Sequence, residues 1–97
     1  MTIRFVTRHP GAREWAMQQG LAVDEFVVHL DTRIINPGDV VIGSLPVNLA
    51  ADVCERGGRY LQLSLELPLT LRGCELDIEQ MQACGACLEE YQVTRVE

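Results

Sequence analysis

Two short stretches of the chain combine residue types that bind anions. The first is Thr7-Arg8-His9-Pro10-Gly11 and the second is Gly43-Ser44-Leu45-Pro46. Each ends a short apolar run and directly precedes a helical pattern, so each predicts a strand end, a polar loop and a helix N-terminus. The free backbone N–H groups of a helix N-terminus favour phosphate. If the two strands are neighbours, both loops meet at one edge of a sheet, where α/β proteins bind ligands.

These loops offer several kinds of phosphate contact. Glycine allows close backbone approach, hydroxyl groups donate hydrogen bonds, and a guanidinium can hold a phosphate through two N–H groups. We therefore expect ligand contacts from Thr7, Arg8, Gly11, Arg13, Gly43, Ser44, Leu45, Pro46 and Asn48, the last in the first turn of the second predicted helix. Simpler interpretations stay open for two of them, because Ser44 could cap the helix and Arg13 could lie on a solvated helix face.

The chain has two histidines, and both lie near predicted strand ends. His9 stands at the centre of the first loop and is the candidate acid or base, although an isolated loop histidine is commonly a plain surface residue. His29 could be a hydrogen-bonded structural residue or a second residue of the site. Asp31, which follows it closely, is expected to belong to a turn.

The four cysteines do not make a convincing metal or redox site. Cys84-Gly85-Ala86-Cys87 has the spacing of zinc ligands, but a zinc site needs a second such pair, and only Cys54, Cys74 and distant histidines remain. A redox pair would start a helix after a strand, whereas this pair follows a helical pattern. We expect free thiols, no metal and no cofactor.

Composition excludes several function classes. Hydrophobic residues make up 47% of the chain, which is typical of a globular protein, and no apolar run is long enough to span a membrane. The net charge is −6, so long nucleic acid is a poor partner, since its binding needs many phosphate contacts. All three charged residues among the first thirteen are arginines, which could focus positive charge on a small anion. Without a signal peptide, a cytoplasmic location is expected.

Strands and short helices alternate along the predicted structure. Apolar runs and strict alternation, as in the leucines of 59–67, predict the strands, whereas glycine, proline and an Asp77 N-cap mark helix ends. The predicted strands cover 3–7, 25–30, 40–42, 59–67 and 91–96, and the predicted helices cover 10–19, 47–56 and 78–84. Trp15 is expected to pack the first helix onto the sheet.

This order predicts an α/β fold. We expect a single small Rossmann-like domain over residues 1–97, with a mostly parallel sheet of about five strands and three helices on its faces. The continuous apolar run at 40–42 is typical of a strand covered on both faces.

The motifs resemble a known family in the same order along nearly the whole chain. The chain is similar to the small CRISPR-associated accessory family numbered sixteen in the Csx series, through Phe5-Val6-Thr7-Arg8-His9-Pro10-Gly11-Ala12-x-Glu14-Trp15-Ala16, His29-Leu30-Asp31, Pro37-Gly38-Asp39, Gly43-Ser44-Leu45-Pro46-Val47-x-Leu49-Ala50 and Leu71-Arg72-Gly73-x-Glu75-Leu76. Members of that family accompany type III CRISPR systems, which signal with cyclic oligoadenylates.

The resemblance implies a ring nuclease that degrades cyclic tetra-adenylate. In the implied reaction, a ribose 2′-hydroxyl attacks the neighbouring phosphodiester and expels the 5′-oxygen, leaving a linear oligoadenylate with a 2′,3′-cyclic phosphate. The substrate supplies the nucleophile, so the protein must orient the ribose, stabilise charge and move protons. The candidate catalytic residues are Arg8 and Ser44 for charge stabilisation and His9 for proton transfer.

A two-fold symmetric ring suits a two-fold symmetric dimer, so a homodimer with one site per subunit is expected. Two other functions stay open. The same loops would serve a protein that binds cyclic oligoadenylate without cutting it, as a sponge or sensor, and the acidic remainder of the chain would suit a partner of CRISPR effectors. A titrating group such as His9 favours cleavage over pure binding.

Overall fold

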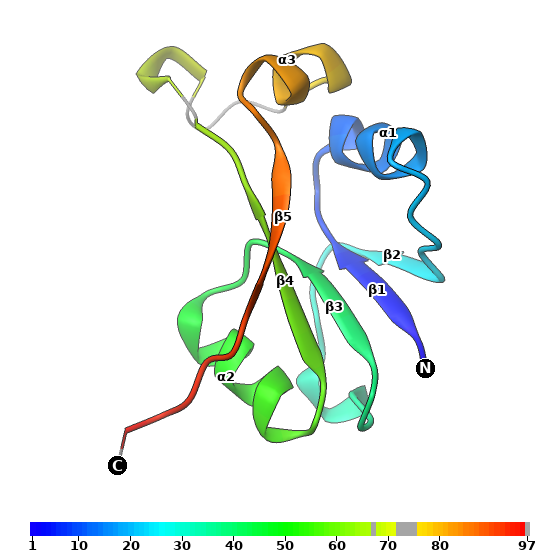
Figure 1. Ribbon diagram of the computed structural model, residues 1–97, viewed down its shortest axis with the longest axis vertical. Coiled ribbons are helices and arrows are strands. Elements are labelled where there is room, and N and C mark those ends of the chain that lie inside the picture. The colour runs from blue at the N-terminus through cyan, green and yellow to red at the C-terminus, as the bar shows by residue number, and fades with distance from the viewer. Residues whose placement is uncertain (67, 72–75, 97) are drawn as a thin grey trace.

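The computed structural model describes residues 1–66, 68–71 and 76–96. The elements are β1 (Ile3–Val6), α1 (Pro10–Gln18), β2 (Glu25–Val27), β3 (Val40–Gly43), α2 (Val47–Glu55), β4 (Arg59–Ser64), α3 (Ile78–Ala83) and β5 (Cys87–Tyr91), with 3₁₀ turns η1 (Thr32–Ile34) and η2 (Leu69–Leu71). The order of strands and helices is the predicted one (Figure 1).

The five strands form one sheet in the order β2-β1-β3-β4-β5. The first four are parallel and β5 pairs antiparallel with β4, which confirms a mostly parallel α/β sheet. The Rossmann-like part of the prediction is not confirmed, because the Rossmann strand order is 3-2-1-4-5-6. Since β1 and β3 are neighbours, their carboxyl ends, and the two candidate loops that follow them, lie side by side.

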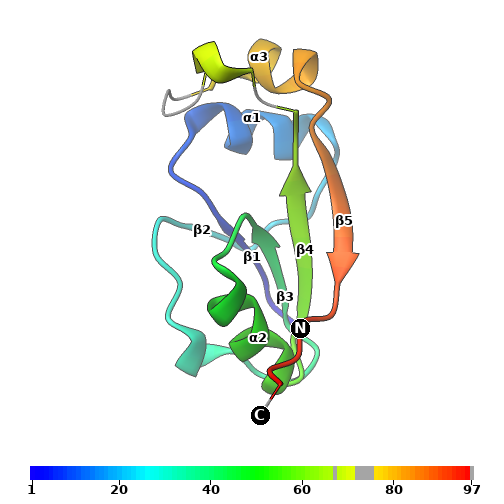
Figure 2. The same ribbon diagram turned by 90° about the vertical axis from the view of Figure 1, so that its left-hand side faces the viewer.

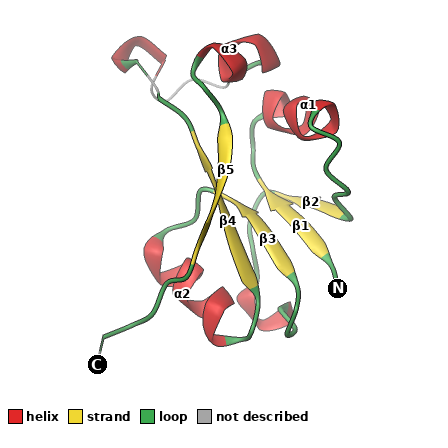
Figure 3. Ribbon diagram, in the orientation of Figure 1, coloured by secondary structure: helices red, strands yellow, loops and turns green. Residues whose placement is uncertain are grey.

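Apolar clusters lie on both faces of the sheet. On one face, α1 and α3 pack beside each other, and Phe5, Trp15 and Met81 belong to the buried cluster there. On the other face, α2 covers Val41 and Tyr60. Figures 2 and 3 show α1 beside α3, with α2 apart from both. The predicted packing of Trp15 and the two-sided burial of the 40–42 run are confirmed.

Gly11 lets α1 and α3 approach closely. A Cβ atom built on Gly11 would lie 2.3 Å from the carbonyl oxygen of Leu76 and 2.7 Å from the Cα of Asp77. Asp77 itself is the N-cap of α3, as predicted, and its side chain accepts a hydrogen bond from the Gln80 amide at 2.8 Å. The requirement for glycine at position 11 therefore comes from helix packing.

A buried carboxylate joins the amino ends of β1 and β3. Asp39 is 3% exposed and accepts hydrogen bonds from the amides of Thr2 (3.0 Å) and Asn36 (3.1 Å) and from the Arg4 guanidinium (3.0 Å). These bonds hold the pKa of Asp39 down at about 2, with the two amides as the main cause. The Asn36–Asp39 turn therefore ties two strands together, at the end of the sheet opposite the candidate loops.

Two strand predictions need correction. β2 ends at Val27 rather than residue 30, because the chain of β1 leaves the sheet after Thr7 and residues 28–30 have no strand to pair with. The last strand covers Cys87–Tyr91 rather than 91–96. After α3, Gly85 (φ +72°) turns the chain straight into β5.

The residues predicted as the last strand instead cross to α2. Arg95 pairs there with Asp52 and Glu55, each at 2.7 Å, and the Val93 amide donates to the Cys54 sulfur. The strand predicted at 59–67 ends at Ser64, and its predicted last residue, Leu67, lies outside the described residues. The ends of the remaining elements agree with the prediction to within one residue. In the part of the chain that the structure describes, no helix is long and apolar enough to cross a membrane.

Candidate functional site

A pocket of about 1200 Å³ opens where β1 and β3 end. Its wall is formed by the loop after β1, the loop after β3, the loop after β2 and the part of β4 that extends beyond β3. The lining includes eight of the predicted site residues: Thr7, Arg8, His9, His29, Gly43, Ser44, Leu45 and Pro46. The expected convergence of the two loops at one sheet edge is therefore confirmed.

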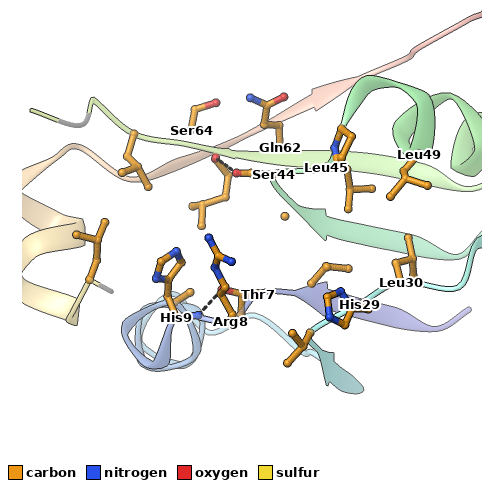
Figure 4. A pocket seen from close by; sticks show the side chains of 18 of the residues that line it. Thr7, Arg8, His9, His29, Leu30, Ser44, Leu45, Leu49, Gln62 and Ser64 are labelled. Atoms are coloured by element: carbon orange, nitrogen blue, oxygen red, sulfur yellow. Dashed lines mark hydrogen bonds between the residues drawn. The ribbon is translucent and has the colours of Figure 1, made fainter. Parts of the chain in front are cut away.

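Arg8 and His9 point from the loop after β1 into the space between that loop and β4 (Figure 4). The hydroxyl of Thr7 accepts a hydrogen bond from the His9 amide at 3.1 Å, which fixes the turn into α1. His9 is the N-cap residue of α1, but its side chain makes no capping bond. In the described residues, its Nδ1 is the only buried side-chain nitrogen or oxygen that lacks a hydrogen-bond partner. Buried polar atoms without a partner are uncommon in folded proteins, so this nitrogen calls for an explanation such as a functional role.

Arginine side chains give the pocket its charge. Arg8 is exposed and makes no salt bridge to any described residue. Arg13 lies over the ring of Phe26, 5.1 Å from its centroid, and lines a smaller adjoining pocket of about 270 Å³ together with Arg8 and His9. Among the described residues that line either pocket there is no aspartate or glutamate. The arrangement favours an anion.

Hydrogen bonds fasten the second loop to β4. The Tyr60 hydroxyl donates to the Gly43 carbonyl at 3.1 Å and accepts from the Leu45 amide at 3.0 Å, and burial raises the pKa of Tyr60. The Ser44 hydroxyl donates to the Leu63 carbonyl at 2.9 Å. Pro46, not Ser44, is the N-cap of α2, so the capping interpretation of Ser44 is wrong. The Leu45 amide and the Ser44 hydroxyl therefore already donate their hydrogen bonds to other groups of the protein.

Three residues predicted to contact the ligand have other roles or positions in the structure. Gly11 is buried against the start of α3 and lines neither pocket. Asn48 is exposed on α2, also outside both pockets, and its carbonyl accepts from Arg95 at 3.2 Å. Gly43 does line the pocket, but a Cβ there would lie 2.7 Å from the Val6 carbonyl oxygen, so the closeness of β1 and β3 already requires a glycine.

Several lining residues were not predicted from the sequence. The largest group is apolar and comes from segments far apart in the chain: Val6, Ala12, Val28, Leu30, Leu49, Leu63, Leu65, Leu76 and Met81. Gln62 and Ser64 add polar groups from β4. Both alternate with the leucines of the predicted strand, but nothing in the sequence showed that β4 extends past β3 and borders the loops.

The cysteines lie away from this pocket. Cys84 is the buried residue that ends α3, Cys87 is exposed at the start of β5, and Cys54 is half-buried, all with free thiols. Cys74 lies outside the described residues. Across residues 1–66, 68–71 and 76–96, no three His, Cys, Asp or Glu side chains gather in a way that could hold a metal ion.

Comparison with known proteins places this chain in a CRISPR-associated family. Residues 4–94 match the model of the family described as "Putative CRISPR-associated protein (Cas_VVA1548)". The chain belongs to this family. The match to the Cas_VVA1548 model covers the loops of the pocket and all of the sheet except Ile3. It supports the CRISPR association that the motif resemblance implies. No curated protein and no solved structure matches the chain.

Proposed function

We propose that this Cas_VVA1548 family member is a metal-independent ring nuclease that opens cyclic tetra-adenylate. The observation that carries the proposal is the pocket itself: an acid-free lining in which Arg8 and the unpartnered imidazole of His9 face the same space at the ends of β1 and β3. Membership of a CRISPR-associated family and the motif resemblance to the sixteenth Csx family support a cyclic oligoadenylate as the anion.

The chemistry asks little of the protein beyond positioning. The substrate's 2′-oxygen bonds to phosphorus, the bond from phosphorus to the 5′-oxygen breaks, and the 2′-hydroxyl proton leaves while the 5′-oxygen gains one. The product is linear, with a 2′,3′-cyclic phosphate. No protein nucleophile, metal or cofactor takes part, and holding the attacking oxygen in line is itself a large share of such a rate enhancement.

Each residue of the loop after β1 has a role in the proposal. The Arg8 guanidinium, without a carboxylate partner among the described residues, binds the non-bridging phosphate oxygens and stabilises the charge of the phosphorane. His9 transfers a proton to or from the sugar oxygens. Arg13, in the adjoining pocket, holds a neighbouring phosphate. Ser44 acts by fastening its loop to Leu63, which keeps the second wall of the pocket in place.

A homodimer completes the proposal. A cyclic tetra-adenylate ring has two-fold symmetry, and an isologous dimer would bring two copies of the pocket onto one ring. Each copy would then hold one phosphodiester at its Arg8 and His9.

The alternative is a binding protein that sequesters the ring without cutting it. The unpaired Arg8 would serve such a protein equally well. Incubation with cyclic tetra-adenylate in EDTA, followed by chromatography, separates the two functions. Linear products support the nuclease, whereas an intact ring that elutes with the protein supports the binding protein. Rings of other sizes are run in parallel, and neither binding nor cleavage of any ring would contradict both.

A further inference from the structure

The pocket has an apolar compartment beside the part that contains Arg8 and His9. It is formed by Val28 and Leu30 from the loop after β2, Leu45 from the loop after β3 and Leu49 from α2. Val28 also lines the smaller pocket with Arg8 and His9. Val28 is 53% exposed, and the other three side chains are half-buried. These apolar groups are therefore within reach of a ligand rather than fully enclosed by protein.

A second apolar part of the lining is not accessible in this way. Leu63, Leu76 and Met81 are 9%, 6% and 1% exposed and belong to the core under α1 and α3. They close the pocket on the side of the core. Unlike these three, Val28, Leu30, Leu45 and Leu49 combine an apolar surface with access from outside.

His29 lies at this compartment. It lines the pocket, it is exposed, and no described residue makes a hydrogen bond to its ring. Figure 4 places His29 beside Leu30 and below Leu45 and Leu49, away from His9. A flat aromatic ring next to apolar side chains suits the face of a nucleobase, since bases stack on aromatic side chains in single-stranded nucleic-acid sites.

We infer that this compartment holds an adenine base, with His29 stacked on it, while Arg8 and His9 face the phosphodiester of the same nucleotide. The inference rests on the proposed function for the identity of the base. It assigns the two histidines different tasks: His9 moves protons, and His29 binds through its ring plane and takes no part in proton transfer.

The test measures what the base adds to binding. Affinities for adenosine 5′-monophosphate and ribose 5-phosphate are measured by NMR titration of the full chain. The wild type should bind the adenine nucleotide at least about tenfold more tightly, as one stacked base contributes. His29→Ala should bring the two affinities to within about twofold of each other. His29→Phe, which keeps the ring but cannot titrate, should retain the preference to within about threefold.

Two further variants separate the compartment from general surface effects. Val28→Ser should reduce the preference for the adenine nucleotide, whereas Met17→Ser, which changes an apolar residue 73% exposed on α1, should leave it unchanged. Equal binding of both ligands by the wild type, binding of neither, or a His29→Phe protein as weak as His29→Ala would each overturn the inference. So would a His29→Phe protein that binds normally but loses turnover.

Failure of the inference can be told apart from failure of the proposed function. A protein that cleaves cyclic tetra-adenylate but binds both small ligands equally lacks the base compartment and remains a nuclease. A protein that prefers the adenine nucleotide but cleaves no ring retains the compartment and is not a nuclease.

Discussion

The Ser44 hydroxyl donates a hydrogen bond to the Leu63 carbonyl oxygen at 2.9 Å, which joins the loop after β3 to the neighbouring strand β4. Because the hydroxyl proton is used in this bond, the Ser44 side chain cannot donate to a phosphate unless the bond breaks. We expect Ser44→Ala to lower the free energy of unfolding by about 1 kcal/mol, the usual value of one such bond. Turnover of cyclic tetra-adenylate should fall by less than about fivefold, which denaturant melts and initial rates can check. A stable protein with a hundredfold slower rate would instead make Ser44 a direct contact.

His9 is expected to affect the rate far more than the binding. Replacing it with alanine removes the proton carrier, so turnover should fall by about a hundredfold to ten-thousandfold. The Kd for the ring should change by less than about threefold, because the phosphate contacts of Arg8 remain. Single-turnover rates and equilibrium binding measure the two effects separately. Met17→Ala, on the exposed surface of α1, is the control. Equal turnover in the His9→Ala protein would remove His9 from the mechanism.

Arg8 is expected to carry much of the affinity for phosphate. Arg8→Ala should weaken ring binding by about tenfold or more and reduce the slope of log Kd against log salt by about 0.7, the value for one phosphate contact on a single strand. Arg13→Ala should show a smaller loss, since its guanidinium also rests on Phe26. As the control, Arg33→Ala removes an exposed arginine that pairs with Asp31 and lines neither pocket. A salt dependence unchanged in Arg8→Ala would contradict the role of Arg8.

Asp39 should make the protein sensitive to acid. Its pKa in the folded protein is about 2, below the value of about 3.9 for a free aspartate, so its contribution is fully present above the unfolded pKa and is lost as the pH falls through 2. We expect the wild type to melt at a higher temperature than Asp39→Asn above pH 5, and the gap to shrink between about pH 4 and pH 2. Glu14→Gln, at an exposed position, should show no such gap. A gap that stays constant down to pH 2 would contradict this account.

Local sequence patterns were enough to predict most of the elements and the position of the pocket. The apolar run of β3 and the Asp77 cap are properties of neighbouring residues, and the structure agrees with both. The alternating leucines predicted β4 but not its end, since only Leu61 and Leu63 lie within the strand. The convergence of the loops at Arg8 and Ser44 followed from the general rule that ligands bind at the carboxyl ends of parallel strands.

Features that depend on distant contacts could not be predicted. Gly11 looked like a ligand contact, because its true neighbour, the backbone of Leu76, is far away in the sequence. β5 contains Glu89 and Glu90, and these two charged residues obscure the alternation that would predict a strand. The segment is a strand because it pairs with β4, which is distant in the sequence. Residues 72–75, part of the last motif of the resemblance, lie outside the described residues.

The most direct measurement compares two rings in EDTA: cyclic tetra-adenylate and the same ring with every 2′-hydroxyl methylated, with products identified by mass spectrometry. The account predicts that the first ring becomes linear oligoadenylate ending in a 2′,3′-cyclic phosphate, and that the methylated ring stays intact because it has no nucleophile. An unmodified ring that stays intact, or a methylated ring that is cut, would contradict the proposed reaction.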